Sequence, residues 1–348
     1  MIDEPGTDRR VLVDSGLVPA TLDAQWYVSP ETYERERRTV WSDQWTMFCP
    51  ASELATPGSF VADSLAGWPV LVVRSPDGVL RGFHNVCPHR AGPIAWPGTG
   101  AIGNLVCRYH GWAFGWDGEL KSARDFGDDP DLCPAEAGLV PIDVDVWGHL
   151  VFVRLRREGP GLSEDLAGFT ARTEGFPMDS FTYGHRLVRH LDCNWKTYAD
   201  NYLEGYHVPL LHPSLNRALD MSTYRVEVPA TDHCVHLCDT TEGSPSGGAW
   251  LFRYPNLAIN VYSDGMNVER IVPVDHRRTK VVYDYFAIDP SRIESMVELS
   301  NVVLDEDQAI CESVQRNLDA GVYRAGRLSP RHEGAVAWFQ GRIRAEVS

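Results

Sequence analysis

The chain has 348 residues, of which 43% are hydrophobic and 23% are charged, and this composition is typical of a folded protein with one large or two medium domains. Its 48 acidic residues outnumber the 32 basic ones and give a net charge of −16, which disfavours nucleic acid and anionic membranes as partners. No stretch approaches the roughly 18 uninterrupted apolar residues of a membrane helix, and residues 1–5 lack the pattern of a secretion signal. We therefore expect a cytoplasmic protein.

The distribution of turn residues divides the chain into three blocks. Residues 1–42 contain charged helical segments, which we expect to pack with the third block. Residues 43–157 have short β-rich runs, such as Val70–Arg74, separated by Gly and Pro turns, and they predict a small all-β domain. Residues 158–348 mix helices with strands, so the whole chain is expected to belong to the α+β class.

The third block has three alternating runs and one long helical segment. The alternation fits an antiparallel sheet with one wet face. The runs are 233–237, 257–262 and 280–286. A helix is predicted from about Ser291 to Ala320, because Ser291 and Glu294 have the spacing of a capping box and Gly321 follows the end.

Two cysteines and two histidines stand in two short segments of the all-β block. Cys87 and His89 are separated from Cys107 and His110 by 17 residues, and each segment offers one thiolate and one imidazole. In zinc sites, the two ligands of one segment are usually of the same type. One cysteine and one histidine in each segment instead suit two irons, with both cysteines on one iron and both histidines on the other. The motif predicts a Rieske-type [2Fe-2S] cluster; the alternatives are structural zinc and four unrelated core residues.

A pair of histidines lies in the α+β block. Residues 194–212 predict a helix that Pro209 ends or kinks. On an uninterrupted helix, His207 and His212 would point about 140° apart, given 3.6 residues per turn. The proline break lets both imidazoles converge on one metal, although two satisfied core or surface histidines are the alternative.

Carboxylates precede the first of these histidines at helical spacing. Asp200, Glu204 and His207 stand at i, i+4 and i+7, so two carboxylates share a face with His207. One of them is well placed to hold the second ring nitrogen of the histidine. A facial triad for non-haem Fe(II) needs two histidines and one carboxylate, so a further carboxylate is expected from elsewhere.

The long helix supplies the expected third ligand. An apolar stripe along it includes one acid and consists of Val303, Asp307, Ile310, Val314 and Leu318. Asp305 and Glu306 fall outside that stripe. An ionised carboxylate facing a core is costly unless it is paired or binds a metal, so Asp307 is the predicted ligand and a buried salt bridge is the alternative.

Both constellations, in this order, resemble the catalytic α-subunit of Rieske non-haem iron oxygenases, and the resemblance spans residues 45 to about 327. It implies a Rieske domain ahead of a helix-grip catalytic domain, with a [2Fe-2S] cluster and a mononuclear Fe(II). It also implies a ring-shaped homotrimer in which electrons pass from the His110 side of one chain to the His207 side of its neighbour. The bridging acid would be Glu204, and Asn201 would line the iron pocket, although a solvated helix position is the alternative for Asn201.

Two departures from related branches bear on function. Ring-dihydroxylating members usually have Asp where this chain has Glu204. With Glu at this position, the chain resembles members that act on quaternary ammonium compounds such as carnitine. Respiratory Rieske proteins carry an additional cysteine in each loop and a serine, at positions that are Gly92, Tyr109 and Trp112 here. We therefore expect a cluster potential in the lower part of the range from about −150 to +300 mV.

The resemblance implies an enzyme, the terminal component that uses O2 and electrons from a separate reductase or ferredoxin to hydroxylate an aromatic or other small organic substrate. An oxidative N- or O-demethylase or quaternary ammonium monooxygenase is the alternative. Outside the oxygenases, a Rieske electron carrier with a non-catalytic binding domain and a hydrophobic-ligand binding module stay open. No nicotinamide or flavin fingerprint is evident, so an electron donor is expected as a partner.

Two other groups of residues admit two interpretations each. Cys234, His236 and Cys238 alternate on one face of a predicted strand, where ligands do not readily close on one ion. We expect an ordinary strand there, with the wall of a substrate pocket as the alternative. Four aromatic residues are expected in the core, with a cage for a methylated ammonium group as the alternative. These are Trp250, Phe252, Tyr254 and Tyr262.

Overall fold

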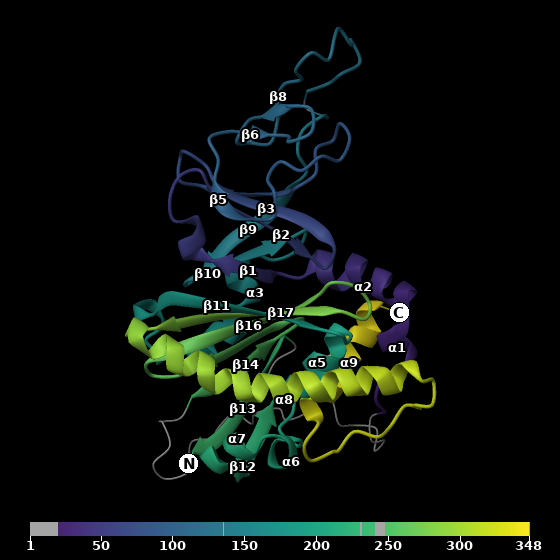
Figure 1. Cartoon of the computed structure of the whole chain (residues 1–348), viewed down its shortest axis with the longest axis vertical. Helices are drawn as coiled ribbons and strands as arrows, with labels where there is room; N and C mark the ends of the chain where they lie inside the picture. Colours follow the sequence, from purple (N-terminus) through teal and green to yellow (C-terminus); the bar gives the residue numbers. More distant parts are fainter. Residues whose placement is uncertain (1–19, 135, 230–231, 241–247, 348) are drawn as a thin grey trace, which may run out of the picture.

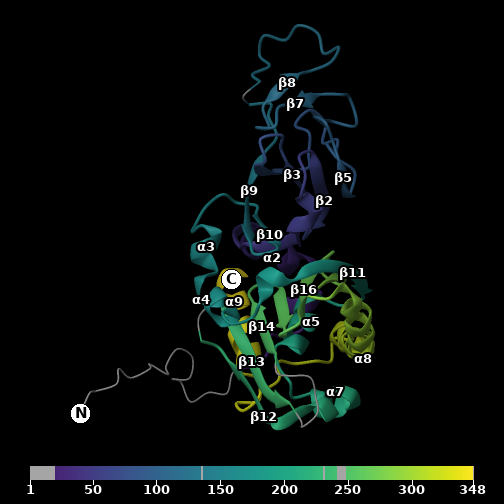
Figure 2. The ribbon, with the colours of Figure 1, turned by 90° about the vertical axis from the view of Figure 1, so that its left-hand side faces the viewer.

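Two seven-stranded antiparallel sheets and a small third sheet are stacked along the long axis of the molecule (Figures 1 and 2). The structure, a computed structural model, describes residues 20–134, 136–229, 232–240 and 248–347. The first part of the N-terminal segment, residues 1–19, lies outside the described residues. The mixture of helices with antiparallel sheets confirms the predicted α+β class.

The first large sheet is built mainly from the β-rich block. Its strand order is β1 (Thr46–Pro50), β10 (Leu150–Arg154), β9 (Pro141–Trp147), β4 (Leu80–His84), β3 (Trp68–Arg74), β2 (Ser59–Leu65) and β5 (Gly98–Ala101). Strand β3 lies inside the sheet, and the β-branched and apolar residues at its centre, 70–73, are fully buried. Such a run is the composition expected of a strand that is covered on both faces.

The small third sheet lies at the far end of the molecule (Figure 1). It contains β6 (Leu105–Val106), β7 (Ala113–Phe114) and β8 (Leu120–Ser122). The segment that joins β6 to β7 holds Cys107 and His110, whereas Cys87 and His89 follow strand β4 of the first sheet. Short strands at the base of each segment therefore anchor the two halves of the predicted cluster motif.

The second large sheet is built from the C-terminal half of the chain. Its order is β11 (Thr182–Leu191), β17 (Thr279–Ala287), β16 (Gly265–Pro273), β15 (Leu257–Val261), β14 (Ala249–Arg253), β13 (His233–Thr240) and β12 (Leu219–Glu227). The three predicted runs appear as β13, β15 and β17. Every residue of β16 is buried, because helices cover the sheet (Figure 2).

Helices flank the second sheet, and α8 runs across it (Figure 1). The helices are α1 (Gln25–Val28), α2 (Pro30–Asp43), η1 (Ala51–Leu54), α3 (Leu162–Asp165), α4 (Ala167–Thr173), η2 (Met178–Ser180), α5 (Trp195–Tyr202), α6 (Val208–Leu211), α7 (Pro213–Ala218), η3 (Pro290–Arg292), α8 (Ile293–Asp319) and α9 (Gly334–Val347). None of the helices in the described residues is long and apolar enough to cross a membrane.

The start of α8 differs from the prediction. The capping box of Ser291 and Glu294 is wrong, because Asp289 caps a preceding 3-10 turn and its carboxylate accepts a hydrogen bond from the Ser291 backbone N–H at 2.9 Å. Helix α8 then begins at Ile293. Asp289, followed by Pro290, therefore caps the 3-10 turn that precedes α8, in place of a cap by Ser291.

The buried face of α8 is rotated from the predicted stripe. It consists of Leu304, Asp307, Cys311, Gln315 and Leu318, while Ile310 and Val314 are each 39% exposed. A polar residue occupies this face because the side chain of Gln315 accepts a hydrogen bond from the Asn194 backbone N–H at 2.9 Å. The prediction that Asp307 faces inward is correct, since this residue belongs to both sets.

The helix predicted over residues 194–212, with an end or kink at Pro209, is interrupted as expected but earlier in the chain. Helix α5 ends at Tyr202, and α6 begins at Val208 with Pro209 in its first turn, where the missing N–H is not needed. The break precedes the proline because the Glu204 carboxylate turns back and accepts hydrogen bonds from the backbone N–H groups of Tyr206 and His207. Such local bonds compete with helix continuation.

A buried ion pair joins the N-terminal helix α2 to α5. The Glu36 and Lys196 side chains are fully buried, and their charged atoms lie 2.6 Å apart. The indole N–H of Trp195 donates to the other Glu36 oxygen at 2.8 Å, and Lys196 also donates to the Asn194 side chain at 2.8 Å. These bonds fix the start of the helix that leads to the predicted metal ligands.

We predict that Glu36→Gln destabilises the protein, because it leaves the Lys196 charge buried without a counter-ion. The expected loss is about 3 kcal/mol or more, measured as the free energy of unfolding in urea. Glu34→Gln on the same helix is the matched control, because Glu34 is 42% exposed and pairs with arginines at the surface. The control should cost no more than about 1 kcal/mol. Equal losses for the two variants would contradict the importance of the buried pair.

Candidate metal centres

Three predicted ligands meet at one point beside the second sheet. His207, His212 and Asp307 each offer one ligand atom, and these atoms lie within 4.8 Å of one another. The Nε2 atoms of the two histidines are 3.2 Å apart, and Asp307 Oδ1 lies 3.1 Å from His212 Nε2 and 3.8 Å from His207 Nε2. His207 and His212 flank helix α6, and Asp307 lies on α8, more than 90 positions further along the chain.

Carboxylates hold the outer nitrogens of both histidines. His207 Nδ1 lies 2.6 Å from Glu204 Oε1, and His212 Nδ1 lies 2.7 Å from Glu306 Oε2. With the proton assigned to each Nδ1, both Nε2 lone pairs point toward Asp307. Three electron-pair donors that converge without a shared proton need a cation between them, so the donor set fits a metal ion. Two imidazoles and one carboxylate are the ligands of non-haem Fe(II) sites.

The electrostatic environment also favours positive charge at this point. Burial lowers the pKa of His212, but its hydrogen bonds with Asp307 and Glu306 raise the pKa, and the net shift is upward. The same negative charges would stabilise a metal cation bound by the Nε2 atoms.

Sequence reasoning missed Glu306. It had placed this residue outside the inward face of α8, and its side chain is indeed 29% exposed, yet its carboxylate reaches His212. A chemical argument could have found it. A metal-binding histidine usually donates its other N–H to an acceptor, and the prediction provides such an acceptor for His207 but none for His212.

Asn201 and Asp200 differ in their relation to the three ligands. The Asn201 amide donates to Asp307 Oδ1 at 2.7 Å, so Asn201 lies beside the ligand set. The structure does not bring Asp200 there. Its carboxylate accepts hydrogen bonds from the Tyr27 hydroxyl at 2.6 Å and the Gln340 amide at 3.0 Å, and burial raises its pKa to about 7. Asp200 thus ties α5 to α1 and α9.

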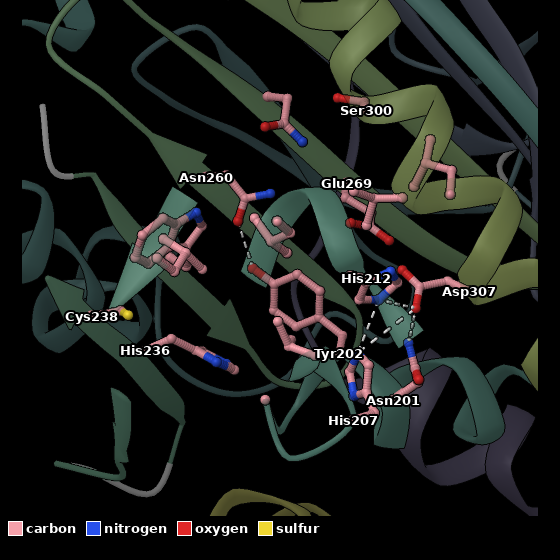
Figure 3. A pocket seen from close by; sticks show the side chains of 18 of the residues that line it. Asn201, Tyr202, His207, His212, His236, Cys238, Asn260, Glu269, Ser300 and Asp307 are labelled. Atoms are coloured by element: carbon pink, nitrogen blue, oxygen red, sulfur yellow. Dashed lines mark hydrogen bonds and ion pairs between the residues drawn. The ribbon is translucent and has the colours of Figure 1, made fainter. Parts of the chain in front are cut away.

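A cavity of about 230 Å³ opens beside the three ligands. In Figure 3 the ligands lie at one end, His236 and Cys238 lie at the other, and Tyr202 and Asn260 lie between them. The Tyr202 hydroxyl donates to Asn260 at 2.8 Å. A second cavity, of about 410 Å³, shares Asn201 and Glu204 with the first.

The strand β13 forms part of the wall of this cavity. The segment is an ordinary strand, as predicted, and His236 and Cys238 on it line the cavity, so the alternative prediction of a pocket wall also holds. Burial lowers the pKa of His236 to about 4, and the neutral ring lies 2.7 Å from the Tyr224 hydroxyl. The four aromatic residues divide: Trp250 and Tyr262 line the cavity, whereas Phe252 and Tyr254 are fully buried in the core.

The two cluster segments face each other at the far end of the molecule. The rings of His89 and His110 have centroids 4.7 Å apart, and the two cysteine side chains lie within hydrogen-bonding reach of each other. His89 Nδ1 is buried and has no hydrogen-bond partner. A buried ring nitrogen without a partner is costly unless it binds a metal, so these residues fit a [2Fe-2S] cluster.

Close packing leaves room for the cluster ligands only because residue 92 is a glycine. A Cβ atom at Gly92 would lie 2.8 Å from Cys107 Sγ. The indole of Trp112 stacks on His89 with ring centroids 4.7 Å apart and planes at 2°. Gly92 and Trp112, read from the sequence as departures from respiratory Rieske proteins, thus shape the surroundings of the ligands.

A two-iron cluster domain joined to a domain with a two-histidine, one-carboxylate site and an adjoining cavity defines an oxygenase that carries an electron-transfer cluster and a catalytic iron site on one chain. Residues 44–129 match the family described as Rieske [2Fe-2S] domain, and residues 178–236 and 219–348 match the family described as ring hydroxylating alpha subunit (catalytic domain). The chain belongs to the Rieske non-haem iron oxygenases, as a catalytic α-subunit.

Curated relatives and solved structures agree with this assignment. The chain is 33% identical to the chloroplastic choline monooxygenase of Spinacia oleracea, over 92% of this chain and 76% of the relative. It is 29% identical to the carnitine monooxygenase oxygenase subunit of Escherichia coli K12, over 90% and 89% of the two chains. The quaternary ammonium Rieske monooxygenase CntA, in complex with L-carnitine, superposes with a TM-score of 0.84 at 26% identity, covering 95% and 96%. Naphthalene 1,2-dioxygenase with bound indole shares the fold, with a TM-score of 0.79 at 18% identity, covering 94% and 92%.

Membership in the family confirms several predictions. The protein is an enzyme, a terminal oxygenase that uses O2 and a small organic substrate and receives electrons from a partner. It binds a [2Fe-2S] cluster and a mononuclear iron.

We predict that Glu306→Gln lowers the affinity for the mononuclear iron by roughly 10- to 100-fold, because the amide no longer supports His212 as a charged acceptor. Iron content after dialysis against a graded series of chelator concentrations measures the change, while sulfide content reports the intact cluster. The neighbouring Asp305→Asn is the matched control, because Asp305 is 69% exposed and pairs with Arg189 instead. Iron retention by Glu306→Gln equal to that of the control would show that His212 needs no such support.

Proposed function

We propose that this chain is the oxygenase component of a monooxygenase system for a quaternary ammonium compound. The main support is the position of the iron ligands at the end of a cavity. The wall of this cavity combines aromatic rings, such as Trp250 and Tyr262, with carboxylates. Aromatic faces and negative charge attract alkylammonium groups. The relatives named choline monooxygenase and carnitine monooxygenase support the same substrate class.

The ligand assignments form part of this proposal. Cys87, His89, Cys107 and His110 hold the cluster, and His207, His212 and Asp307 hold the iron. The iron supplies oxygen activation when it is bound, and the cluster supplies electrons. Glu204 and Glu306 orient the two histidines, and the Asn201 amide holds Asp307. Asp200, which is tied to Tyr27 and Gln340, has a positioning role through α5.

We further propose a homotrimer in which electrons cross between subunits. The small sheet that holds one cluster segment and helix α6 between the two iron-ligating histidines lie toward opposite ends of the molecule (Figure 1), which supports transfer from a neighbouring subunit. His89 and His110 are only partly buried, and Tyr109 beside them is 56% exposed, so this end is accessible to another chain. Glu204, 13% exposed and bonded to His207, links the iron site to the neighbour's cluster.

The proposal also assigns a role to each part of the chain. Residues 43–157 form the cluster domain, residues 158–348 form the catalytic domain, and residues 1–42 pack with the latter through α2. A separate reductase or ferredoxin reduces the cluster. The cytoplasmic location stays a prediction. A pure electron carrier or a metal-free binding module would not require three converging ligands with oriented outer nitrogens, and this geometry favours the oxygenase.

Anaerobically purified protein should contain three irons and two sulfides per chain and, with a surrogate reductase, should consume O2 and NADH when choline is added. A single oxygen atom from isotopically labelled O2 in each product molecule would identify monooxygenation, whereas two labelled atoms would identify dioxygenation. An aromatic hydrocarbon such as naphthalene serves as the comparison substrate. Turnover of naphthalene but not of choline or carnitine would overturn the proposed substrate class, and two irons per chain after iron reconstitution would favour the electron carrier.

Glu204→Gln should reduce turnover by roughly 10- to 100-fold even when added Fe(II) keeps the iron site filled, because the neutral amide weakens the hold on His207 and the link to the neighbouring subunit. Mixed oligomers separate these two effects. Co-expressed chains that carry either Cys107→Ala or Asp307→Ala should regain activity together, since each supplies what the other lacks. Mixed oligomers as inactive as either variant alone would contradict transfer between subunits.

A further inference from the structure

The wall of the cavity beside the iron ligands has an unbalanced charge. Three carboxylates line it, those of Glu204, Glu269 and Asp307, and no lysine or arginine lines it among the described residues. Glu204 and Asp307 are engaged with the histidines. Glu269, on strand β16, has no part in the metal-binding arrangement described above.

Glu269 is a buried carboxylate whose hydrogen-bond partners are neutral. The residue is 3% exposed, and its Oε1 accepts a hydrogen bond from the Tyr283 hydroxyl at 2.9 Å. The Tyr198 hydroxyl also bonds it and lies 2.5 Å from that of Tyr283. Burial raises the pKa of Glu269 to about 7, the tyrosine hydroxyls lower it, and the nearby Asp307 charge raises it. In the part of the chain that the structure describes, no cationic side chain forms an ion pair with Glu269.

Such a carboxylate is expensive to keep in a protein interior. Burial of a charged group without a counter-ion costs several kcal/mol, and a protein usually pairs the group or replaces it. A cationic ligand in the cavity would remove this cost at the moment of binding. Tyr202, Trp250 and Tyr262 add aromatic surface to the same cavity, which suits the methyl groups of an alkylammonium ion.

We propose that Glu269 is a specificity-determining residue, whose carboxylate is the counter-charge for the substrate's ammonium group, and that the cavity selects a net cation over a zwitterion. This inference rests on the proposed function. A second negative group on the substrate, such as a carboxylate, would meet Glu204, Asp307 and neutral side chains, with no basic partner in the described wall. The favoured substrate is therefore an ammonium alcohol rather than an ammonium acid.

Isothermal titration of the holoprotein without reductase measures binding without turnover. The probes are choline and 3,3-dimethylbutan-1-ol, which has the same shape but carries carbon in place of the charged nitrogen. The wild-type protein should bind choline more tightly. Glu269→Gln keeps the volume and an oxygen that accepts from Tyr283, and it should weaken choline binding at least tenfold, while the neutral alcohol binds within about threefold of its wild-type Kd.

Glu294→Gln is the matched control for the loss of one negative charge. Glu294 is exposed in the first turn of α8, and its substitution should leave both dissociation constants unchanged. Glu269→Met provides a second uncharged variant of similar volume if the glutamine variant does not fold, and the visible spectrum of the cluster verifies folding. L-Carnitine tests the second part of the proposal and should bind the wild-type protein at least tenfold more weakly than choline.

The outcomes separate this inference from the proposed function. A wild-type preference for choline that disappears in Glu269→Gln supports both. A preference that survives in Glu269→Gln overturns the role of Glu269 but leaves the substrate class standing, since aromatic rings would then hold the cation. No preference for choline over the neutral alcohol in the wild-type protein overturns the substrate class and the inference with it. Carnitine that binds as tightly as choline overturns the selection against a zwitterion.

Discussion

The structure depends on the hydrogen bonds that two carboxylates make with the outer nitrogens of two histidines. Glu204 holds His207 and Glu306 holds His212, and these bonds fix which ring nitrogen carries the proton. Both remaining lone pairs then face Asp307, and the group has the geometry and charge of a metal site. The break between α5 and α6 follows from the same carboxylate of Glu204, which also caps the backbone of the turn. The partly exposed side chain of Glu204 thus determines both the conformation of the turn after α5 and the tautomer of His207.

Negative charge is distributed unevenly around this centre. Asp307 and Glu306 lie on the inward side and the flank of α8, Glu204 lies in the turn after α5, and Glu269 lies on the sheet opposite them. A metal cation offsets the charge of the first three. Among the described residues, the carboxylate of Glu269 has hydrogen bonds with tyrosine hydroxyls and no cationic partner, so the substrate is the proposed source of its counter-ion. Glu204 and Asn201 line both the cavity beside the iron ligands and the second cavity.

The elongated arrangement keeps the two predicted ligand sets apart within one chain. The cluster segments lie beyond the first sheet, and the iron ligands lie on the far side of the second sheet. Among the described residues, two buried core clusters contain residues of both large sheets, whereas the residues around the cluster segments form a separate core. The partly buried histidines of the cluster segments and the partly exposed Glu204 are the features on which the proposed subunit assembly rests.

The sequence by itself determined the features that depend on short spacings. The four cluster ligands stand in two short segments where Gly and Pro turns fix the geometry, and the inward position of Asp307 survives although the stripe was assigned to Val303 and Ile310 rather than to Leu304 and Cys311. Both faces of α8 are apolar enough to be buried, so helical periodicity left its rotation open, and the hydrogen bond between Gln315 and Asn194 decided it. Only the tertiary structure brought Glu306 to His212 and Glu269 into the cavity, because those contacts join segments far apart in the chain. Strand register and helix packing determine such contacts, and neither leaves a local signal in the sequence.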